Sequence, residues 1–439
     1  MSGRSLLRDL RAFGAECVRQ ALEGPLYGAG MSLFGLGVGV ASLRGGKARL
    51  LRQGQREVWK RLDSAVKPGE RWIWIHAASL GEFEQGRPLI ERIRAERPEF
   101  RILLTFFSPS GYEVRKNYNG ADCVCYLPLD TPGAARRFLR IVNPEMAVFV
   151  KYELWRGYLR ELYRRQIPSY LISAIFRPEQ DFFHRRGAWR RAWLRWLTGI
   201  FVQDDRSRRL LESVGVANVT VAGDTRFDRV AGIRREARKI DVLERFVGSK
   251  DSPSRRGPVF MAGSSWPADE EVYAPWLAAH KGVKAVVAPH EFDASRLARL
   301  KTLFGEGTVL KSEAERDPSL LDDARVLVID CFGLLSSAYA YADFAYVGGG
   351  FGVGIHNINE AAAWGIPVVY GPNYHKFIEA EELKTLGGGL PVAGRGAFEA
   401  VADRLAFDSE ERTRRGRWAE EYIAEKIGAT DRIISRILK

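Results

Sequence analysis

The chain has 439 residues, more than one ordinary hydrophobic core accommodates, so we expect two domains. An apolar content of 46% indicates a globular protein, and the net charge of +13 favours an acidic partner: nucleic acid, an anionic membrane or a phosphorylated substrate. The four cysteines lack the spacing of a zinc site and are interpreted as reduced thiols.

An uncharged stretch near the N-terminus, residues 24–43, is 20 residues long, about the length that crosses the hydrocarbon core of a bilayer. A cleaved signal peptide is disfavoured because polar, mixed-charge residues precede this stretch. We interpret residues 1–50 as a membrane-associated segment that spans the bilayer or lies on it. The alternative is a glycine-rich helical hairpin packed on the domain. Basic residues follow closely, as is typical beside an anionic leaflet: Arg44, Lys47, Arg49 and Arg52.

Apolar runs alternate with helical patterns through the first half of the chain. Alternation of this kind predicts an open parallel sheet with helices on both faces. The runs that we predict to be strands are residues 71–77, 101–106, 121–127, 146–150, 169–172 and 200–202.

Two carboxylates follow strands of this predicted sheet. Glu82 lies between the first strand and a helix over residues 83–95, where the positive end of the helix dipole should keep the carboxylate ionised near neutral pH. An ionised carboxylate that faces a sugar hydroxyl can act as a general base. Glu153 follows the strand over residues 146–150 and is a second candidate. For both residues the alternative is an ordinary helix-capping acid.

A segment without acidic residues, 182–203, combines arginine with tryptophan. We predict a helix whose arginines and tryptophans suit a membrane interface, or stacking on nucleic acid. The alternative is a helix with one solvated face and one tryptophan-lined core face. The residues are Arg185, Arg186, Arg190, Arg191, Arg195, Trp189, Trp193 and Trp196.

Ligand-competent loops follow successive predicted strands in the second half of the chain. The strands are residues 259–262, 284–288, 326–329 and 343–347. Because the carboxyl ends of parallel strands share one edge of a sheet, we predict a second doubly wound domain with its site at that edge. The first three loops contribute Gly263, Ser264, Pro289, His290, Phe332 and Gly333.

The loop after the fourth strand is rich in glycine, at positions 348, 349, 350, 352 and 354. A short helix over residues 357–364 and a strand over residues 367–370 follow, so that free amides and a helix N-terminus are available for a phosphate. His356 and Glu360 share a helix face, and the carboxylate can accept hydrogen bonds from two ribose hydroxyls. This pattern predicts a nucleotide-sugar donor site. The alternative is a structural turn beside a solvated Glu.

Three motifs resemble those of the Kdo transferases, which add 3-deoxy-D-manno-octulosonic acid (Kdo) to lipid A precursors. They are HAASLGEF at residues 76–83, ELW at residues 153–155, and the stretch from GGGFG through GPN over residues 348–373. The resemblance implies a GT-B glycosyltransferase: an α/β fold of two Rossmann-like domains with a cleft between them. We expect the domains over residues 51–212 and 213–439, with a last helix that returns to the first domain. The resemblance also favours a membrane anchor.

The resemblance further implies transfer of Kdo from CMP-Kdo to a lipid A precursor at the cytoplasmic face of the inner membrane, with inversion and without a metal or other cofactor. Glu82 matches the general base, which would deprotonate the 6′-hydroxyl of the acceptor, and Glu153 would lie near the acceptor or the sugar. The acceptor site would comprise Ser79, Gly81, Arg177, Arg185 and Arg186. The donor site would comprise Gly263, Ser264, Pro289, His290, Phe332, Gly333, Gly349, Gly350, Asn357, Glu360 and Lys376.

One departure and two rival functions stay open. Many relatives carry an Arg-His pair where this chain has Pro289-His290, which leaves Lys376 or backbone amides to neutralise the donor phosphate. A GT-B enzyme with a UDP-sugar donor would share the glycine loop and Glu360. A non-enzymatic membrane or nucleic-acid binding protein would share the basic, tryptophan-rich segment, whereas the resemblance implies no nucleic-acid partner. A dinucleotide dehydrogenase is disfavoured because no acid lies at the expected distance from the glycines.

Overall fold

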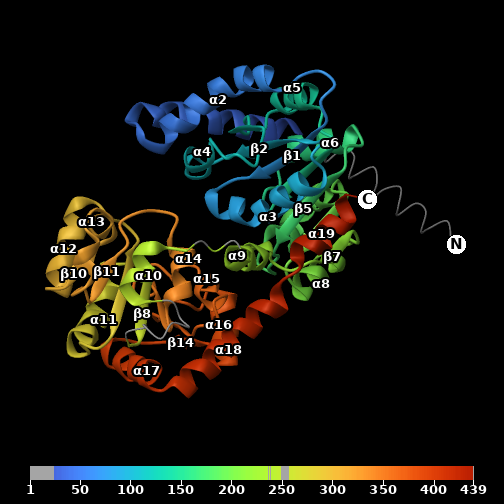
Figure 1. Cartoon of the computed structure of the whole chain (residues 1–439). Helices are drawn as coiled ribbons and strands as arrows, with labels where there is room; N and C mark the ends of the chain where they lie inside the picture. Colours follow the sequence, from blue (N-terminus) through green and yellow to red (C-terminus); the bar gives the residue numbers. More distant parts are fainter. Residues whose placement is uncertain (1–23, 236, 238, 249–256, 439) are drawn as a thin grey trace. The chain divides into compact units, whose positions relative to one another are not determined.

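The computed structural model describes residues 24–235, 237, 239–248 and 257–438 (Figure 1). The chain forms two compact units, Met1–Arg229 with Gly428–Lys439, and Val230–Ile427. The first unit therefore ends later than the boundary predicted after residue 212. The reason is a further strand, β7 (Val219–Val221), which pairs with β6 and so keeps the chain in the first sheet.

The first unit contains a parallel sheet of seven strands in the order β3-β2-β1-β4-β5-β6-β7. All six strands predicted here are confirmed, and β7 is additional. The other strands are β1 (Trp72–Ala77), β2 (Arg101–Phe106), β3 (Cys123–Tyr126), β4 (Met146–Val150), β5 (Ser169–Ala174) and β6 (Gly199–Val202). The helices are α2 (Gly46–Ala65), α3 (Leu80–Glu96), α4 (Pro109–Arg115), α5 (Pro132–Val142), α6 (Arg156–Arg164), α7 (Arg191–Arg195), α8 (Asp205–Ser213) and α19 (Ala429–Ile437), with α9 (Thr225–Arg235) crossing into the second unit.

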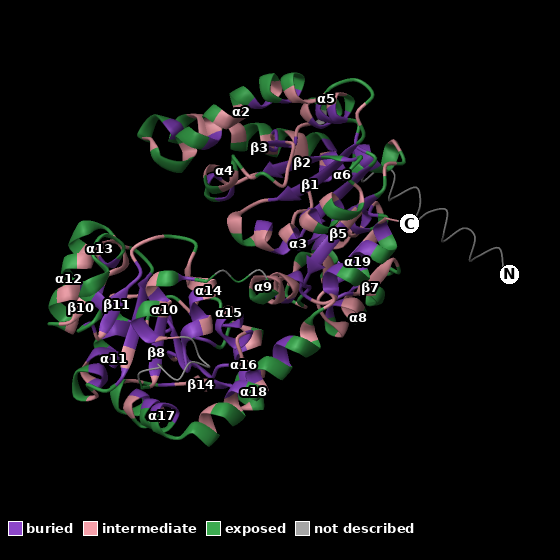
Figure 2. Cartoon of the chain, viewed as in Figure 1, coloured by how far each residue is buried: buried purple, intermediate pink, exposed green. Residues whose placement is uncertain are grey.

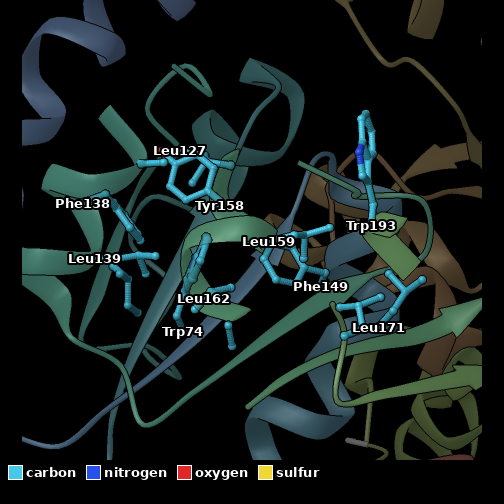
Figure 3. Close-up of a cluster of buried hydrophobic side chains, with 14 of the residues drawn as sticks. Trp74, Leu127, Phe138, Leu139, Phe149, Tyr158, Leu159, Leu162, Leu171 and Trp193 are labelled. Carbon is cyan, nitrogen blue, oxygen red and sulfur yellow. The ribbon is translucent and has the colours of Figure 1, made fainter. Parts of the chain in front are cut away.

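Apolar side chains cover both faces of this sheet, as parallel strands require. Trp74 lies in the cluster on one face, together with Phe138 and Tyr158 (Figure 3), whereas the adjacent Ile73 and Ile75 belong to the cluster on the other face. Figure 2 shows the burial along the strands, while the helices expose their outer sides. The sheet thus forms a rigid base whose strand ends can hold functional residues.

The C-terminal helix α19 belongs to the first unit because its side chains complete that unit's core. Ile433, Ile434 and Ile437 are buried in the cluster that also contains residues of α3. The carboxylate of Asp228 accepts hydrogen bonds from the amides of Gly428 and Thr430, both at 2.6 Å, and so caps the helix. The last helix that we expected to return to the first domain is α19, which is separated from α18 by a break at Gly428, where φ is +96°.

The arginine- and tryptophan-rich segment is not the single helix that we predicted. It consists of two 3₁₀ turns, η2 (Asp181–Phe183) and η3 (Arg185–Arg190), followed by the short α7. Gly187 allows the tight turn, since a Cβ there would lie 2.0 Å from the carbonyl oxygen of Asp181. Trp193 is buried and Trp189 packs against the same core, so the tryptophans stabilise the fold rather than face a ligand.

Residues Gly24–Arg44 form one helix of 21 residues with a mean hydropathy of 1.5 in its most apolar window, of which 6% is buried. One side contacts the first unit: the Tyr27 hydroxyl donates to Asp130 at 2.8 Å, and the Phe34 ring stacks on Phe107. The alternative of a buried helical hairpin is therefore wrong for the described residues. The opposite side exposes five large apolar side chains: Leu26, Leu33, Leu36, Val40 and Leu43.

The second unit contains another parallel sheet of seven strands, in the order β10-β11-β9-β8-β12-β13-β14. Its strands are β8 (Val259–Ser265), β9 (Lys284–Pro289), β10 (Thr308–Leu310), β11 (Val326–Val328), β12 (Phe344–Val347), β13 (Val368–Tyr370) and β14 (Gly389–Pro391). Its helices are α10 (Asp241–Val247), α11 (Pro267–Ala279), α12 (Ala294–Phe304), α13 (Lys311–Arg316), α14 (Leu335–Ala338), α15 (Asn359–Ala362), α16 (Ile378–Leu386), α17 (Arg395–Phe407) and α18 (Ser409–Lys426). Its 3₁₀ turns are η4 (Pro318–Leu321) and η5 (Tyr339–Tyr341). The turn η1 (Ser42–Arg44) belongs to the first unit, at the end of the helix Gly24–Arg44.

Candidate active site

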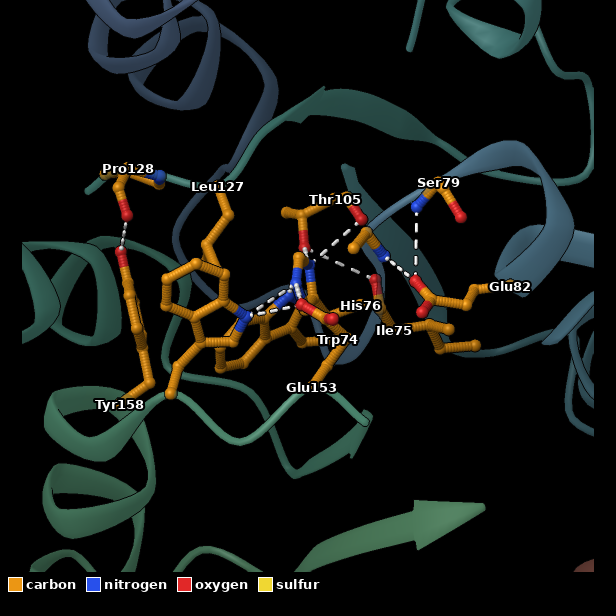
Figure 4. A network of polar contacts seen from close by, with 12 residues as sticks. Trp74, Ile75, His76, Ser79, Glu82, Thr105, Leu127, Pro128, Glu153 and Tyr158 are labelled. Carbon is orange, nitrogen blue, oxygen red and sulfur yellow. Dashed lines mark hydrogen bonds and ion pairs between the residues drawn. The ribbon is translucent and has the colours of Figure 1, made fainter. Parts of the chain in front are cut away.

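Glu82 lies in the first turn of α3, directly after β1. Its Oε2 accepts hydrogen bonds from the backbone amides of Ala78, at 2.7 Å, and Ser79, at 3.2 Å (Figure 4). This is the capping-box arrangement, in which Ser79 is the N-cap residue. Among the described residues, nothing bonds to Oε1. The carboxylate is thus fixed through one oxygen and open at the other.

The environment of Glu82 raises the pKa of its carboxyl group. Burial is the main cause, and the nearby carboxylate of Glu153 adds to it, whereas the amides of Ala78 and Ser79 act in the opposite direction. Burial thus acts against the positive end of the helix dipole, which we expected to keep Glu82 ionised. A higher pKa makes the ionised Glu82 carboxylate a stronger base.

Glu153 is held in a network that connects β1, β2 and the loop after β4. Its Oε2 lies 3.1 Å from Nε2 of His76 and accepts a hydrogen bond from Nε1 of Trp155 at 2.8 Å. Nδ1 of His76 lies 2.9 Å from Oγ1 of Thr105, in the buried interior of the sheet (Figure 4). The network holds the Glu153 carboxylate near Glu82, where its negative charge raises the pKa of the Glu82 carboxyl group.

His76 and Trp155 lie within the motifs at residues 76–83 and 153–155, but we predicted no role for either of them. The available signal was a polar residue, His76, inside a strand that is otherwise apolar and that ends beside Glu82. A buried histidine needs partners for both ring nitrogens, and Glu153 and Thr105 are those partners.

Tyr152 marks a second group of residues near Glu82. Burial raises the pKa of the Tyr152 phenol, Arg177 and Arg226 lower it, and Glu82 raises it, so these charges surround one ring. The predicted acceptor residue Arg177 therefore lies in the neighbourhood of Glu82. Ser79 and Gly81 also lie there, at the start of α3. Arg185 and Arg186 are exposed, and no contact within the described residues joins them to this group.

The predicted donor residues of the second unit gather at one edge of its sheet. Four strands that are neighbours in that sheet, β11, β9, β8 and β12, run parallel, so their carboxyl ends lie together. These ends carry Gly263, Ser264, Pro289, His290, Phe332, Gly333, Gly349 and Gly350. Ser264 has a φ of +51°, a left-handed conformation that is unusual for serine.

The glycine loop after β12 is held by its own amides, contrary to our prediction of free donors. The amide of Gly348 donates to Gly263, that of Gly349 donates to the Asp269 carboxylate, and those of Gly352 and Gly354 donate to Gly349. Glycine is needed for close packing, since a Cβ on Gly348 would lie 2.3 Å from the carbonyl oxygen of Ser264. Among the described residues, only Gly350 of this run has an amide without an acceptor.

The helix after the glycine loop, α15, has four residues rather than the eight predicted, so it adds little dipole. Glu360 on this helix is oriented by two neighbours: Oε2 accepts from the Ser336 hydroxyl at 2.5 Å, and Oε1 accepts from the Asn357 amide at 3.1 Å. Lys376 is exposed, and no partner is found for it within the described parts of the chain.

Comparison with known proteins shows similarity to one family. A family profile described as 3-deoxy-D-manno-octulosonic-acid transferase (kdotransferase) matches residues 52–229. Proteins named 3-deoxy-D-manno-octulosonic acid transferase are similar over most of the chain: that of Aquifex aeolicus is 27% identical over 77% of this chain and 87% of its own length, and that of Haemophilus influenzae is 27% identical over 88% and 91%. The chain thus resembles Kdo transferases, through the profile match in its first unit and through similarity to these proteins over most of its length. It is a glycosyltransferase.

Solved structures show the fold of this chain. A UDP-GlcNAc 2-epimerase from Neisseria meningitidis superposes with a TM-score of 0.55 at 14% identity, covering 84% of this chain and 99% of its own. The calicheamicin glycosyltransferase CalG4 superposes with a TM-score of 0.51 at 14% identity, covering 84% and 100%. The chain has two seven-stranded parallel sheets, and together with these superpositions they confirm the predicted GT-B fold. The profile match includes Glu82 and Glu153, whereas the donor residues lie beyond it.

Proposed function

We propose that this protein transfers Kdo from CMP-Kdo to the lipid A precursor lipid IVA in lipopolysaccharide biosynthesis, with inversion at the anomeric carbon. Similarity to the curated relatives supports the Kdo donor, since these proteins are named for that transfer. The single observation that carries the mechanism is the Glu82 carboxylate, which is fixed by two amides at Oε2 and open at Oε1.

In the proposed reaction, the 6′-hydroxyl of the acceptor donates a hydrogen bond to Oε1 of Glu82. As that hydroxyl oxygen forms a bond to the anomeric carbon of Kdo, its proton passes to Glu82, and the bond between the anomeric carbon and the phosphate oxygen breaks. CMP leaves with the bonding electrons from the face opposite the attack, which inverts the carbon. Glu153, held by His76 and Trp155, keeps a negative charge near Glu82 and so keeps Glu82 basic.

On the donor side, we propose that Glu360 accepts hydrogen bonds from the two ribose hydroxyls of CMP-Kdo. Its orientation by Ser336 and Asn357 supports this role, because the carboxylate is already placed before a ligand binds. The phosphate would receive hydrogen bonds from the Gly350 amide and the exposed Lys376, since the other glycine amides are engaged within the loop.

The assay that tests the proposal offers a tetra-acylated lipid A precursor and CMP-Kdo generated in situ, with products read by mass spectrometry. Addition of Kdo supports the function, and the number of residues added defines whether transfer stops at one. No addition, with UDP rather than CMP competing for the nucleotide site, would instead support the rival GT-B enzyme with a UDP-sugar donor.

The acceptor's phosphates are proposed to bind Arg185 and Arg186, which are exposed, whereas Arg190 pairs with Asp181 and Arg191 donates to the Phe182 carbonyl oxygen. Replacing both Arg185 and Arg186 with alanine should raise the KM for the lipid acceptor by about 100-fold, because each of the two arginine–phosphate pairs contributes about 1.5 kcal/mol or more. The KM for CMP-Kdo should stay unchanged.

A matched control removes the same charge elsewhere in the first unit, through Arg206→Ala with Arg209→Ala on α8. An equal rise in acceptor KM for both double variants would mean that net charge, not this segment, attracts the acceptor.

We propose that the exposed apolar side of the helix Gly24–Arg44 lies against the cytoplasmic face of the inner membrane, with the following basic residues near lipid headgroups. Leu33→Asp with Leu36→Asp should weaken binding to anionic vesicles by about 10-fold or more, since each leucine loses its burial in lipid. Co-sedimentation with vesicles measures this.

The control for the membrane prediction is Leu320→Asp with Leu386→Asp, which alters two exposed leucines of the second unit. Retention of vesicle binding by the helix variant, or equal loss by the control, would place the membrane contact elsewhere.

A further inference from the structure

Three aromatic rings from three loops of the second unit form a stack beside the glycine loop. Trp266 follows β8, His290 follows β9, and His356 follows the glycine run after β12. The centroids of Trp266 and His290 are 4.4 Å apart with an angle of 22° between the planes, and those of His290 and His356 are 4.6 Å apart with an angle of 30°. Nε1 of Trp266 also donates a hydrogen bond to Nε2 of His356, at 3.0 Å.

The hydrogen bond from Trp266 determines where His356 carries its proton. An indole N–H can only donate, so Nε2 of His356 must be the acceptor and cannot bear a hydrogen. The neutral ring then has its proton on Nδ1. Burial and the neighbouring His290 lower the pKa of His356, while Asp269 raises it, which together favour the neutral form.

Asp269 is the only carboxylate that acts on His356 among the described residues, and its charge is directed elsewhere. Its Oδ1 accepts from the Tyr346 hydroxyl at 2.7 Å, and its Oδ2 accepts from the Gly349 amide at 2.8 Å. Asp269 therefore ties the glycine loop to α11 rather than pairing with the imidazole.

We infer that Trp266 is a positioning residue that holds His356 with its proton on Nδ1, so that Nδ1 donates a hydrogen bond to a phosphate oxygen of the nucleotide donor. The inference rests on the proposed function and adds a residue that sequence reasoning did not single out. Two observations support the phosphate as the acceptor. Most glycine amides of the loop are engaged within the protein, so the phosphate needs side-chain donors, and Nδ1 of His356 has no partner within the described residues.

The test measures the tautomer and the nucleotide affinity of the full-length protein in detergent, labelled with ¹⁵N-histidine. In the unliganded wild type, His356 should show a protonated Nδ1 and an unprotonated Nε2 from pH 8 to pH 6. Trp266→Phe should free Nε2, so that the ring populates both tautomers and gains a proton as the pH falls. Loss of a fixed neutral donor should weaken CMP binding about 3- to 10-fold at pH 8.

The pH dependence separates this role from a merely structural one. As the pH falls and His356 of the variant becomes a cation, both ring nitrogens carry a proton, so CMP affinity should recover towards that of the wild type at the same pH. A structural defect would not recover. Trp276→Phe is the control, because that indole donates to Asp403 instead, at 2.7 Å.

A protonated Nε2 in the wild type, or equal CMP affinity of wild type and Trp266→Phe at pH 8, would overturn the inference. The failure of the proposed function is a distinct result: the tautomer and the effect of Trp266→Phe would persist, but with UMP or UDP as the nucleotide that binds.

Discussion

Glu82→Gln should lower kcat for Kdo transfer by about 10²- to 10⁴-fold while leaving the affinity for CMP nearly unchanged. The glutamine side chain keeps a carbonyl oxygen that can accept from the amides of Ala78 and Ser79, so the start of α3 should stay intact. What is lost is the ability to take the proton of the attacking hydroxyl. Turnover with CMP-Kdo and CMP binding by calorimetry are the two measurements.

Glu84→Gln is the matched control, since this carboxylate lies two residues further along the same helix and pairs with Arg115 at 2.8 Å. Normal turnover by Glu82→Gln would refute the assignment of the base. Equal loss in both variants would point to damage to the helix.

The pH profile gives a second test of Glu82. The base acts when deprotonated, and its pKa is raised above the usual range of a glutamate, so activity should fall as the pH drops through that raised pKa. Glu153→Gln removes one of the causes of the shift. If that variant keeps activity, its acid limb should move to lower pH; a limb that stays in place would show that Glu82 does not control the profile.

Glu360→Gln should weaken CMP binding by about 100-fold, because two hydrogen bonds from ribose hydroxyls to a carboxylate are each worth about 1.5–3 kcal/mol. The structure orients this carboxylate through Ser336 and Asn357, and a glutamine oxygen can still accept from Ser336, so the local fold should persist. Calorimetric titration with CMP measures the loss.

A nucleotide without the 2′-hydroxyl makes this prediction specific. The wild type should bind 2′-deoxy-CMP more weakly than CMP, whereas Glu360→Gln should bind the two alike. Glu381→Gln is the matched control, since this exposed carboxylate of the same unit pairs with His375. Discrimination that survives in Glu360→Gln would mean that another group reads the ribose.

Alternation of apolar runs with helical patterns was enough to predict both sheets, because buried parallel strands are continuous apolar segments. The strands that the sequence did not reveal, β7, β10 and β14, have three residues each and lie at sheet edges. Most of their residues are only partly buried, and they include Thr, Gly or Pro, whereas the equally short β11 and β13 are fully buried and apolar enough to detect. Missing β7 is also why the predicted boundary fell too early.

The sequence predicted individual residues of the candidate site but not the contacts between them. Glu82 and Glu360 were found because strand ends and glycine loops are visible in sequence. The partners that orient Glu360 and His356 were not, since Ser336 lies on α14 and Trp266 follows β8, both far along the chain from the residues that they orient. The glycine amides were misjudged for the same reason: the Asp269 carboxylate that engages one of them lies 80 positions away.

The return of the C-terminus to the first unit has a consequence for how the protein is made. Residues 428–438 follow the whole of the second unit in the chain, yet Ile433, Ile434 and Ile437 complete a core begun by strands more than 300 positions earlier. The second unit is continuous along the chain and is fully translated first. It can therefore fold during synthesis, whereas the first unit completes its core only after α19 has also been made.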